Sequence, residues 1–374
     1  MGRRLARLTA CGMTLAAGLA MAGCGMFGQP GNGGSSAPPN TVAQGFKIGL
    51  LLPDSTTARY EKFDRPLITQ SIAALCPKCQ VVYYNADHDA SMQQRQFDAA
   101  LDVDVQVIIL DPVDAKAIAP MVSRAHDEDV PIVAYDRLAR GPINAYTSFD
   151  NIQVGKMQGQ ALLDAISTGG DPERGPIVML NGSPLDPNAS DFAKGARSVL
   201  NGRVVIGKEY DVPNWSPEQA RLDAVDAFTA LGAAKVIGVY AANDSLAGGA
   251  AEAMRDTGVR KGTPLTGQDA ELTAIQRILL GTQTMTVYKP IKSEAENAAE
   301  MAIDLGTGKK VKGSGSGSGT VDNGTSSSIP ARIVQPAVVT RENIKETVVK
   351  DGFWKVQDIC VASVQAACKA AGLS

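Results

Sequence analysis

Residues 46–52 read FKIGLLL, a continuous apolar run that is typical of a β-strand buried on both faces of a sheet. A helical pattern follows over residues 59–75, and the next strand pattern covers residues 81–84. The alternation continues with strand patterns at 105–110, 132–135 and 145–149 and helical patterns at 91–101 and 115–128. Strands and helices that alternate in this way predict a parallel sheet with right-handed crossovers.

The same alternation starts again after residue 150. Strand patterns lie at 177–180, 204–210, 235–240, 264–267, 284–288 and 333–339. Helical patterns lie at 189–200, 217–231, 246–256, 271–279, 291–305 and 342–349. Two such sets predict the α/β class, with two doubly wound, Rossmann-like lobes that bind a ligand at the carboxyl ends of their strands.

Length, composition and charge narrow the class of protein. With 374 residues, the chain is long enough for two domains of ordinary size. A content of 44% hydrophobic and 20% charged residues is that of a soluble globular protein. The net charge is −3 and no long basic run follows the N-terminal segment, so we expect no nucleic-acid binding. We also expect no cofactor and no metal site.

The N-terminal segment predicts export. Residues 1–24 have a basic start, an apolar centre and small residues directly before Cys24, the order of a bacterial lipoprotein signal peptide. We therefore expect Cys24 to carry lipid and to hold the protein on the outer face of the cell membrane. A plain secretory signal with an incidental cysteine is the alternative. Residues 25–44 include the Gly/Pro/Ser-rich run GQPGNGGSSAPPN and predict a flexible tether.

The remaining cysteines form two local pairs, Cys76 with Cys79 and Cys360 with Cys368. In an exported protein such pairs predict disulfides. A redox motif at Cys76 and Cys79 is the alternative, but that motif opens a helix after a strand, whereas this pair ends a helix and precedes a strand. Metal binding by the four thiols is less expected still, because few histidines accompany them.

Polar residues recur where the predicted strands end. They include Arg59, Tyr60, Asp64, Arg65, Asp136, Arg137, the run 182–188 (GSPLDPN), Trp215, Asn243, Asp244, Gln268, Asp269 and Lys289. This set suits a sugar, whose C–H faces pack on aromatic rings and whose hydroxyls both donate and accept hydrogen bonds. Tyr60 and Trp215, one in each lobe, could sandwich a sugar ring.

Each of these residues also has a purely structural interpretation. Asn243 or Asp244 could cap the helix that follows, and Trp215 could plug a loop over the core. Asp136, Arg137 and Lys289 could be a helix cap and exposed charges. Their joint placement at strand ends in both lobes favours a binding site.

Seven segments of the chain resemble those of bacterial sugar-binding subunits of ABC importers, in particular the D-xylose-binding family. They are VAYDR (133–137), SFDN (148–151), VGKMQGQAL (154–162), GSPLDPNA (182–189), GQDAEL (267–272), GTQTMTVYKPI (281–291) and ETVVKDGF (346–353). The resemblance runs from about residue 47 to residue 354. It implies the type I periplasmic binding protein fold, whose two lobes are joined by three crossovers and close around a sugar.

The resemblance also implies boundaries and ligands. It places the crossovers near residues 150–151, 283–286 and 328–332, so that residues 45–150 with 286–328 form one lobe and residues 151–285 with 329–374 the other. The implied sugar ligands are Arg59, Tyr60, Asp136, Arg137, Asn188, Trp215, Asn243, Asp269 and Lys289. The implied partners are a permease and an ATPase, and the subunit is expected to be a monomer.

Three departures from the family pattern leave the exact sugar open. Tyr60 stands where the family has tryptophan, Pro187 stands where it has asparagine, and Phe63 shifts the acid–arginine pair that follows. Asp64 and Arg65 are therefore uncertain contacts. D-xylose is the expected ligand, with glucose, arabinose and galactose as alternatives.

The sequence disfavours two other functions and leaves a third open. A LacI-type regulator would need a basic helix-turn-helix before the first strand, where this chain has a signal and a tether. An exported enzyme is not expected, since the chain lacks the G-x-S-x-G, H-E-x-x-H and phosphate-loop motifs. Asp136 and Asp269 could form a glycosidase pair, but Arg137 and Lys289 would keep both ionised. An additional role as the partner of a membrane sensor stays open.

Overall fold

The computed structural model describes residues 40–315 and 319–373, and every structural statement concerns those residues. The predicted signal peptide, the expected lipid attachment at Cys24 and most of the predicted tether lie outside them. Among the described helices, none combines the length and apolarity needed to cross a bilayer.

The N-terminal lobe is built on a mostly parallel sheet, in the strand order β10-β12-β5-β4-β3-β1-β2. Its main strands are β1 (Lys47–Leu52), β2 (Gln80–Asn85), β3 (Val107–Leu110), β4 (Ile132–Tyr135), β5 (Ala145–Phe149) and β12 (Ile329–Val334). The short strands β10 (Ser314–Gly315) and β11 (Thr320–Val321) both pair with β12, and β11 is antiparallel to it. Two residues of the Gly/Ser run 313–319 (GSGSGSG), Ser314 and Gly315, therefore lie in a strand.

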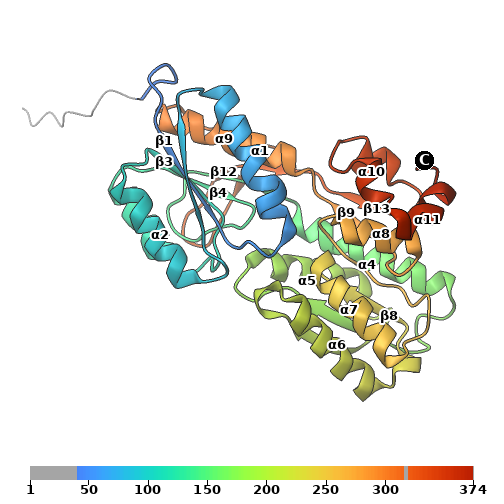
Figure 1. The fold of residues 1–374 in the computed structure, drawn as a ribbon. Coiled ribbons are helices and arrows are strands. Elements are labelled where there is room, and N and C mark those ends of the chain that lie inside the picture. The colour runs from blue at the N-terminus through green and yellow to red at the C-terminus, as the bar shows by residue number, and fades with distance from the viewer. Residues whose placement is uncertain (1–39, 316–318, 374) are drawn as a thin grey trace, which may run out of the picture. The chain divides into compact units, whose positions relative to one another are not determined.

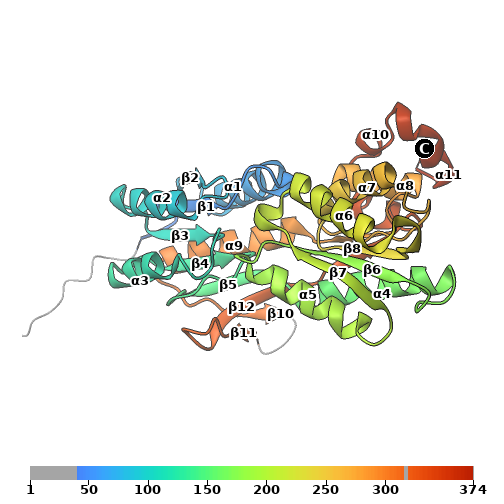
Figure 2. The same cartoon turned by 90° about the horizontal axis from the view of Figure 1, so that it is seen from below.

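Helices cover both faces of this sheet. Leu50 and Leu52 face α1 (Arg65–Leu75) and α9 (Ile291–Gly306), whereas Leu51 faces α2 (Ala90–Asp102) and α3 (Ala119–Asp127). Successive residues of a strand point to opposite faces, so an unbroken apolar run is what a sheet covered on both sides requires. Figures 1 and 2 show these layers.

The C-terminal lobe repeats this plan on a smaller parallel sheet, in the order β7-β6-β8. Its strands are β6 (Pro176–Asn181), β7 (Val205–Asp211) and β8 (Gly238–Ala241). Helices α4 (Asn151–Thr168) and α5 (Pro187–Leu200) cover one face, and α6 (Pro217–Leu231) and α7 (Asp244–Thr257) the other (Figure 2). Glycine allows α4 and α5 to pack closely, because a Cβ at Gly155 would lie 2.0 Å from the carbonyl oxygen of Phe192.

The strand predicted at residues 264–267 is reduced to one bridge between Leu265 and Val239. Beyond that bridge, the hydroxyl of Thr266 rather than its backbone bonds to the N–H and carbonyl of Ala241. The side chain thus replaces the ladder, and the prediction of a full strand was wrong.

The strand predicted at residues 333–339 is in fact two strands in two sheets. β12 pairs with β5 in the N-terminal lobe, whereas β13 (Ala337–Val339) pairs antiparallel with β9 (Thr286–Tyr288). Pro336, which has no N–H to give a ladder, lies between them. This crossover therefore lies at residues 335–336 instead of 328–332.

Two further crossovers join the lobes. One lies at Asp150, whose carboxylate caps α4. The other lies at residues 289–290, between β9 and α9, rather than at 283–286. Val287 of β9 belongs to the C-terminal core, whereas Ala298 of α9 belongs to the N-terminal core.

The last segment of the chain packs on the C-terminal lobe. Helices α10 (Val356–Ile359) and α11 (Gln365–Ala370) lie against α8 (Leu272–Leu280), as Figure 1 shows in red and orange. The predicted disulfide between Cys360 and Cys368 is present and closes this segment.

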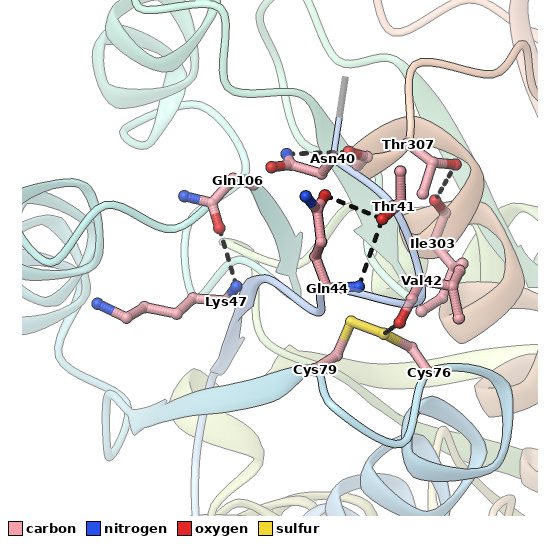
Figure 3. Close-up of a disulfide and its surroundings, with 11 residues drawn as sticks. Asn40, Thr41, Val42, Gln44, Lys47, Cys76, Cys79, Gln106, Ile303 and Thr307 are labelled. Atoms are coloured by element: carbon pink, nitrogen blue, oxygen red, sulfur yellow. Dashed lines mark hydrogen bonds between the residues drawn. A yellow bond between two sulfur atoms is a disulfide. The ribbon is translucent and has the colours of Figure 1, made fainter. Parts of the chain in front are cut away.

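The predicted disulfide between Cys76 and Cys79 is also present, at the end of α1 and directly before β2 (Figure 3). Residues 40–44, which the sequence assigned to the tether, lie beside it. The side chain of Asn40 donates to the carbonyl of Gly306, and Cys76 Sγ lies 3.7 Å from the carbonyl oxygen of Val42. The folded lobe therefore begins a few residues earlier than predicted.

Candidate ligand-binding site

A small cavity lies between the two lobes. Every residue that the sequence singled out as a sugar ligand lines it. The lining consists of Thr57, Arg59, Tyr60, Asp136, Arg137, Asp186, Asn188, Phe192, Trp215, Asn243, Gln268, Asp269 and Lys289. Both lobes contribute, because the carboxyl ends of their parallel strands face each other across the cavity.

The turn after β1 places Arg59 and Tyr60. Asp54 accepts hydrogen bonds from the backbone N–H groups of Thr56 and Thr57, at 3.0 and 2.6 Å, and so fixes the start of the turn. A π-helical turn, Tyr60–Asp64, then leads into α1. Such turns accommodate an extra residue within a helix and are frequent at functional sites, which fits the shift that Phe63 introduces in the sequence.

Arg59 is held by the carboxyl groups of three buried acidic residues. Its Nε and Nη2 donate to Asp64 at 3.1 and 2.7 Å, Nη2 also donates to Glu294 at 3.0 Å, and Nη1 donates to Asp136 at 3.0 Å. A guanidinium has five N–H groups, so one hydrogen on Nη1 stays free for a ligand. Burial alone would lower the pKa of Arg59, but the neighbouring acidic groups raise it well above its ordinary value.

Asp136 follows β4 with a positive φ of 55°, which turns its side chain toward Arg59. Its carbonyl oxygen accepts hydrogen bonds from the hydroxyls of Ser148 and Tyr146, at 2.7 and 3.0 Å. Burial alone would raise the pKa of Asp136, but Arg59, Lys289 and Arg137 lower it to about 2. Asp136 is therefore a fixed, charged acceptor at neutral pH and a poor general acid.

Arg137 connects the lobes. Its Nη2 donates to the hydroxyl of Tyr60 at 3.1 Å and its Nη1 to the carbonyl of Pro112 at 3.1 Å. Its Nε lies 2.9 Å from Oδ2 of Asp186, which caps α5 in the other lobe. The orientation of the Tyr60 ring is thus fixed by the same arginine that crosses the cavity.

Trp215 supplies an aromatic wall from the C-terminal lobe. Its indole Nε1 donates to Asp186 at 3.2 Å, and its ring lies edge-on to that of Phe192. Gly182 makes room for it, because a Cβ there would lie 2.0 Å from the ring. The indole is therefore held by a bond and by close packing, in an orientation suited to stacking.

The two predicted asparagines have structural as well as lining roles. Asn188 donates to the carbonyl of Asp136 at 3.2 Å and accepts from Asn151 at 2.9 Å. Asn243 caps α7 by accepting from the N–H of Leu246, so the cap interpretation of this residue holds while its side chain also lines the cavity. Asp244 does not line it.

Lys289 and Asp269 form the remaining charged wall. Lys289 Nζ lies 3.0 Å from Oδ1 of Asp269 and 3.8 Å from Oδ1 of Asp136. Beside them, Oε1 of Gln268 is buried and has no hydrogen-bond partner. Since buried polar atoms are normally paired, this oxygen is a ready acceptor for a ligand hydroxyl.

The structure settles where the two uncertain residues of the first loop lie. Asp64 does not line the cavity but is fully buried behind Arg59, and Tyr135 donates to it at 2.5 Å. Arg65 points outward, pairs with Glu61 at 2.9 Å and lies over the ring of Tyr83. Asp64 therefore supports a cavity residue, and Arg65 does not.

Four lining residues were not among the predicted ligands. Asp186 and Gln268 both lie in segments that the sequence analysis identified at strand ends. Asp186 resembled a helix cap, and Gln268 stood beside the stronger candidate Asp269. Phe192 lies one helical turn after Asn188, and that spacing could have placed it on the same face. Nothing in the sequence pattern pointed to Thr57 as a cavity residue.

The cavity offers charged donors, charged acceptors, amides and aromatic faces in a small buried volume. That combination suits a small polyhydroxylated ligand. Among the described residues, no group of His, Cys, Asp and Glu side chains has a geometry that could hold a metal ion.

Comparisons with known proteins agree with this geometry. Residues 48–310 match the family model described as periplasmic binding protein domain. The chain is 36% identical to the D-xylose-binding periplasmic protein of Escherichia coli, over 85% of this chain and 93% of that protein. It is 32% identical to a multiple sugar-binding periplasmic protein of Azospirillum brasilense, over 82% of this chain and 89% of that one.

A solved structure has the same fold. It is a carbohydrate transporter solute-binding protein from Chloroflexus aurantiacus, in complex with D-glucose. Its TM-score is 0.74 and its sequence identity 26%, and the match covers 83% of this chain and 97% of that one.

Proposed function

Since the chain belongs to the periplasmic binding protein family, as a sugar-binding subunit of the ABC importer type, we propose that it captures D-xylose between its two lobes. It then delivers the sugar to a permease and an ATPase. The observation that carries this proposal is that charged and aromatic groups from both lobes converge on one buried cavity. We further propose that the protein acts as a monomer and catalyses no reaction.

Two lines of support favour D-xylose. The relative from Escherichia coli, 36% identical over most of both chains, is named for binding that sugar. The dense set of fixed donors, acceptors and aromatic faces from both lobes suits a compact pyranose.

A broader aldose receptor is the second candidate. The relative from Azospirillum brasilense is named for binding multiple sugars, and the structure from Chloroflexus aurantiacus holds D-glucose. Tyr60 also departs from the family pattern at the first stacking position. The same protein could in addition report its sugar to a membrane sensor.

Lobe closure supplies the mechanism of capture. Arg137 and Asp186, and Asn188 and Asp136, already connect the lobes across the cavity. A sugar that bonds to both sides adds further contacts that exist only when the lobes are closed, and so shifts the population toward the closed state. The closed, loaded form is the one that we expect the permease to receive.

The membrane anchor is a separate part of the proposal. Cys24 at the end of the signal pattern would carry the lipid, and the run after it would hold the folded lobes away from the bilayer. Cys24→Ser should move the protein from the membrane fraction to the soluble fraction. A variant that stays in the membrane fraction would contradict lipidation at this residue.

Uptake tests the transport role. Cells that lack this chain should lose uptake of labelled D-xylose at low sugar concentration and regain it when the chain is restored. Uptake of glucose, arabinose and galactose in the same cells separates the dedicated receptor from the broad one. Unchanged uptake of all four sugars would contradict the importer role.

A further inference from the structure

An aromatic cluster connects the two lobes outside the cavity. Phe63 of the N-terminal lobe stacks on Phe353 of the C-terminal lobe, with ring centroids 4.1 Å apart and planes inclined by 21°. The ring of Trp354 meets Phe63 edge-on at 5.2 Å. The Nζ of Lys62 lies 4.1 Å from the centre of the Trp354 ring. We call Phe63, Phe353 and Trp354 the aromatic clasp.

The C-terminal half of the clasp is firmly held. Trp354 is 5% exposed and belongs to the core formed by α8 and the last helices. Phe353 lies 5.0 Å from the ring of Tyr288, whose hydroxyl donates to Asp351 at 2.6 Å. This half therefore moves with its own lobe, and only Phe63 and Lys62 come from the other one.

Both halves of the clasp are connected to residues that line the cavity. On the N-terminal side, Phe63 lies in the π-helical turn that begins at Tyr60. On the C-terminal side, Trp354 Nε1 donates to the carbonyl oxygen of Ala270 at 2.7 Å. Ala270 follows Asp269, and both have positive φ, at 50° and 92°. Such backbone strain persists only where neighbouring contacts hold it, and the indole bond is one of these contacts.

We propose that the aromatic clasp is a positioning device for the sugar site. It favours the closed arrangement of the lobes, and it holds the turn that presents Asp269. The proposal rests on the proposed function in that its ligand is the sugar of the same cavity. The clasp touches no cavity-bound ligand itself, since none of its three residues lines the cavity.

The two halves predict different kinetic effects. Phe63→Ala removes the interlobe stack and leaves the C-terminal core intact, so release of the sugar should accelerate while the rate of capture changes little. An aromatic pair contributes enough for a change of roughly two- to tenfold in the release rate. Trp354→Phe keeps a ring and removes the N–H, so it should weaken binding through Asp269.

The experiment measures capture and release of D-xylose by stopped-flow fluorescence on the purified protein and its variants. Leu75→Ala is the matched control, because Leu75 is an exposed apolar residue of the neighbouring helix. Phe63→Tyr is the conservative variant and should restore slow release. The melting temperature of each variant reports whether it remains folded.

A second readout needs no ligand. Small-angle X-ray scattering of the sugar-free protein gives its radius of gyration, which should be larger for Phe63→Ala than for the wild type if the clasp favours closure. If the wild type binds no aldose, the proposed function fails. The comparison of radii still shows whether the clasp favours the closed arrangement of the lobes. Release rates and radii that match the wild type in Phe63→Ala would overturn the proposal.

Discussion

The Nε of Arg137 in the N-terminal lobe lies 2.9 Å from Oδ2 of Asp186 in the C-terminal lobe. The same oxygen of Asp186 accepts from Trp215, while its other oxygen caps α5. One carboxylate thus sets the approach of the lobes, the orientation of the stacking ring and the start of a helix. Burial raises the pKa of Asp186, although Arg137 opposes that rise.

The first prediction concerns this ion pair. Asp186→Asn keeps a side chain that can cap a helix but removes the charge that faces Arg137. Removing one partner of a buried ion pair costs roughly 3–5 kcal/mol, and we expect part of this loss as a fall in D-xylose affinity of roughly tenfold or more. Titration calorimetry measures the change. Asp127→Asn, at an exposed position of the same protein, is the control, and equal affinities of the two variants would contradict the interlobe role.

The second prediction concerns stacking. Trp215→Ala removes the aromatic wall, so affinity should fall by about 1–3 kcal/mol, whereas Trp215→Phe should retain part of it. Titration calorimetry measures the affinity of each variant without relying on indole fluorescence. If Trp215→Ala binds D-xylose as tightly as the wild type, the indole only fills space.

The third prediction separates two neighbours that the sequence could not tell apart. Asp64→Asn should weaken sugar binding although Asp64 does not line the cavity, because Arg59 loses its bidentate charged partner. Arg65→Gln should leave affinity unchanged, since Arg65 is on the surface. Titration calorimetry with D-xylose measures the affinity of both variants. Equal affinities would show that Arg59 does not need the charge of Asp64.

The fourth prediction concerns pH. Burial raises the pKa of Glu294 well above its ordinary value, Asp136 and Asp64 add to the rise, and Arg59 and Lys289 oppose it. The folded protein therefore holds a proton that the unfolded chain releases above about pH 4.3. Stability linked to this proton is fully present below that pH and is lost as the pH rises toward the raised pKa.

Glu294→Gln has no such proton to lose, and its amide oxygen can still accept from Arg59. As the pH rises above about 4.3, the wild type should therefore lose stability that this variant keeps, so the melting temperature of the variant should rise relative to that of the wild type. Thermal unfolding over that pH range measures the difference. A difference that stays constant, or that shrinks as the pH rises, would contradict a protonated Glu294.

The sequence predicted the parts of this fold that depend on local pattern. The apolar runs at β1, β4 and β6 and the polar residues after them follow directly from two-sided burial and from the meeting of strand ends. What it missed depends on tertiary contacts. The run 333–339 is uniform in pattern, and only pairing with β5 on one side and β9 on the other divides it.

The loop after β1 also depends on tertiary contacts that the sequence does not reveal. An inserted Phe63 is visible in the sequence, but the π-helical turn that absorbs it is not, and this turn returns Asp64 to Arg59 and sends Phe63 toward Phe353. Thr57 was missed because its place in the cavity wall comes from its bond to Asp54 rather than from any pattern along the chain.

The most direct test of the account is a calorimetric titration of the purified protein with D-xylose, D-glucose, L-arabinose and D-galactose. We predict saturable one-to-one binding of D-xylose, with the other three sugars weaker. Comparable binding of several of them would make the protein a broad aldose receptor. No binding of any of the four sugars would contradict the central claim that the residues lining the cavity between the lobes form a monosaccharide site.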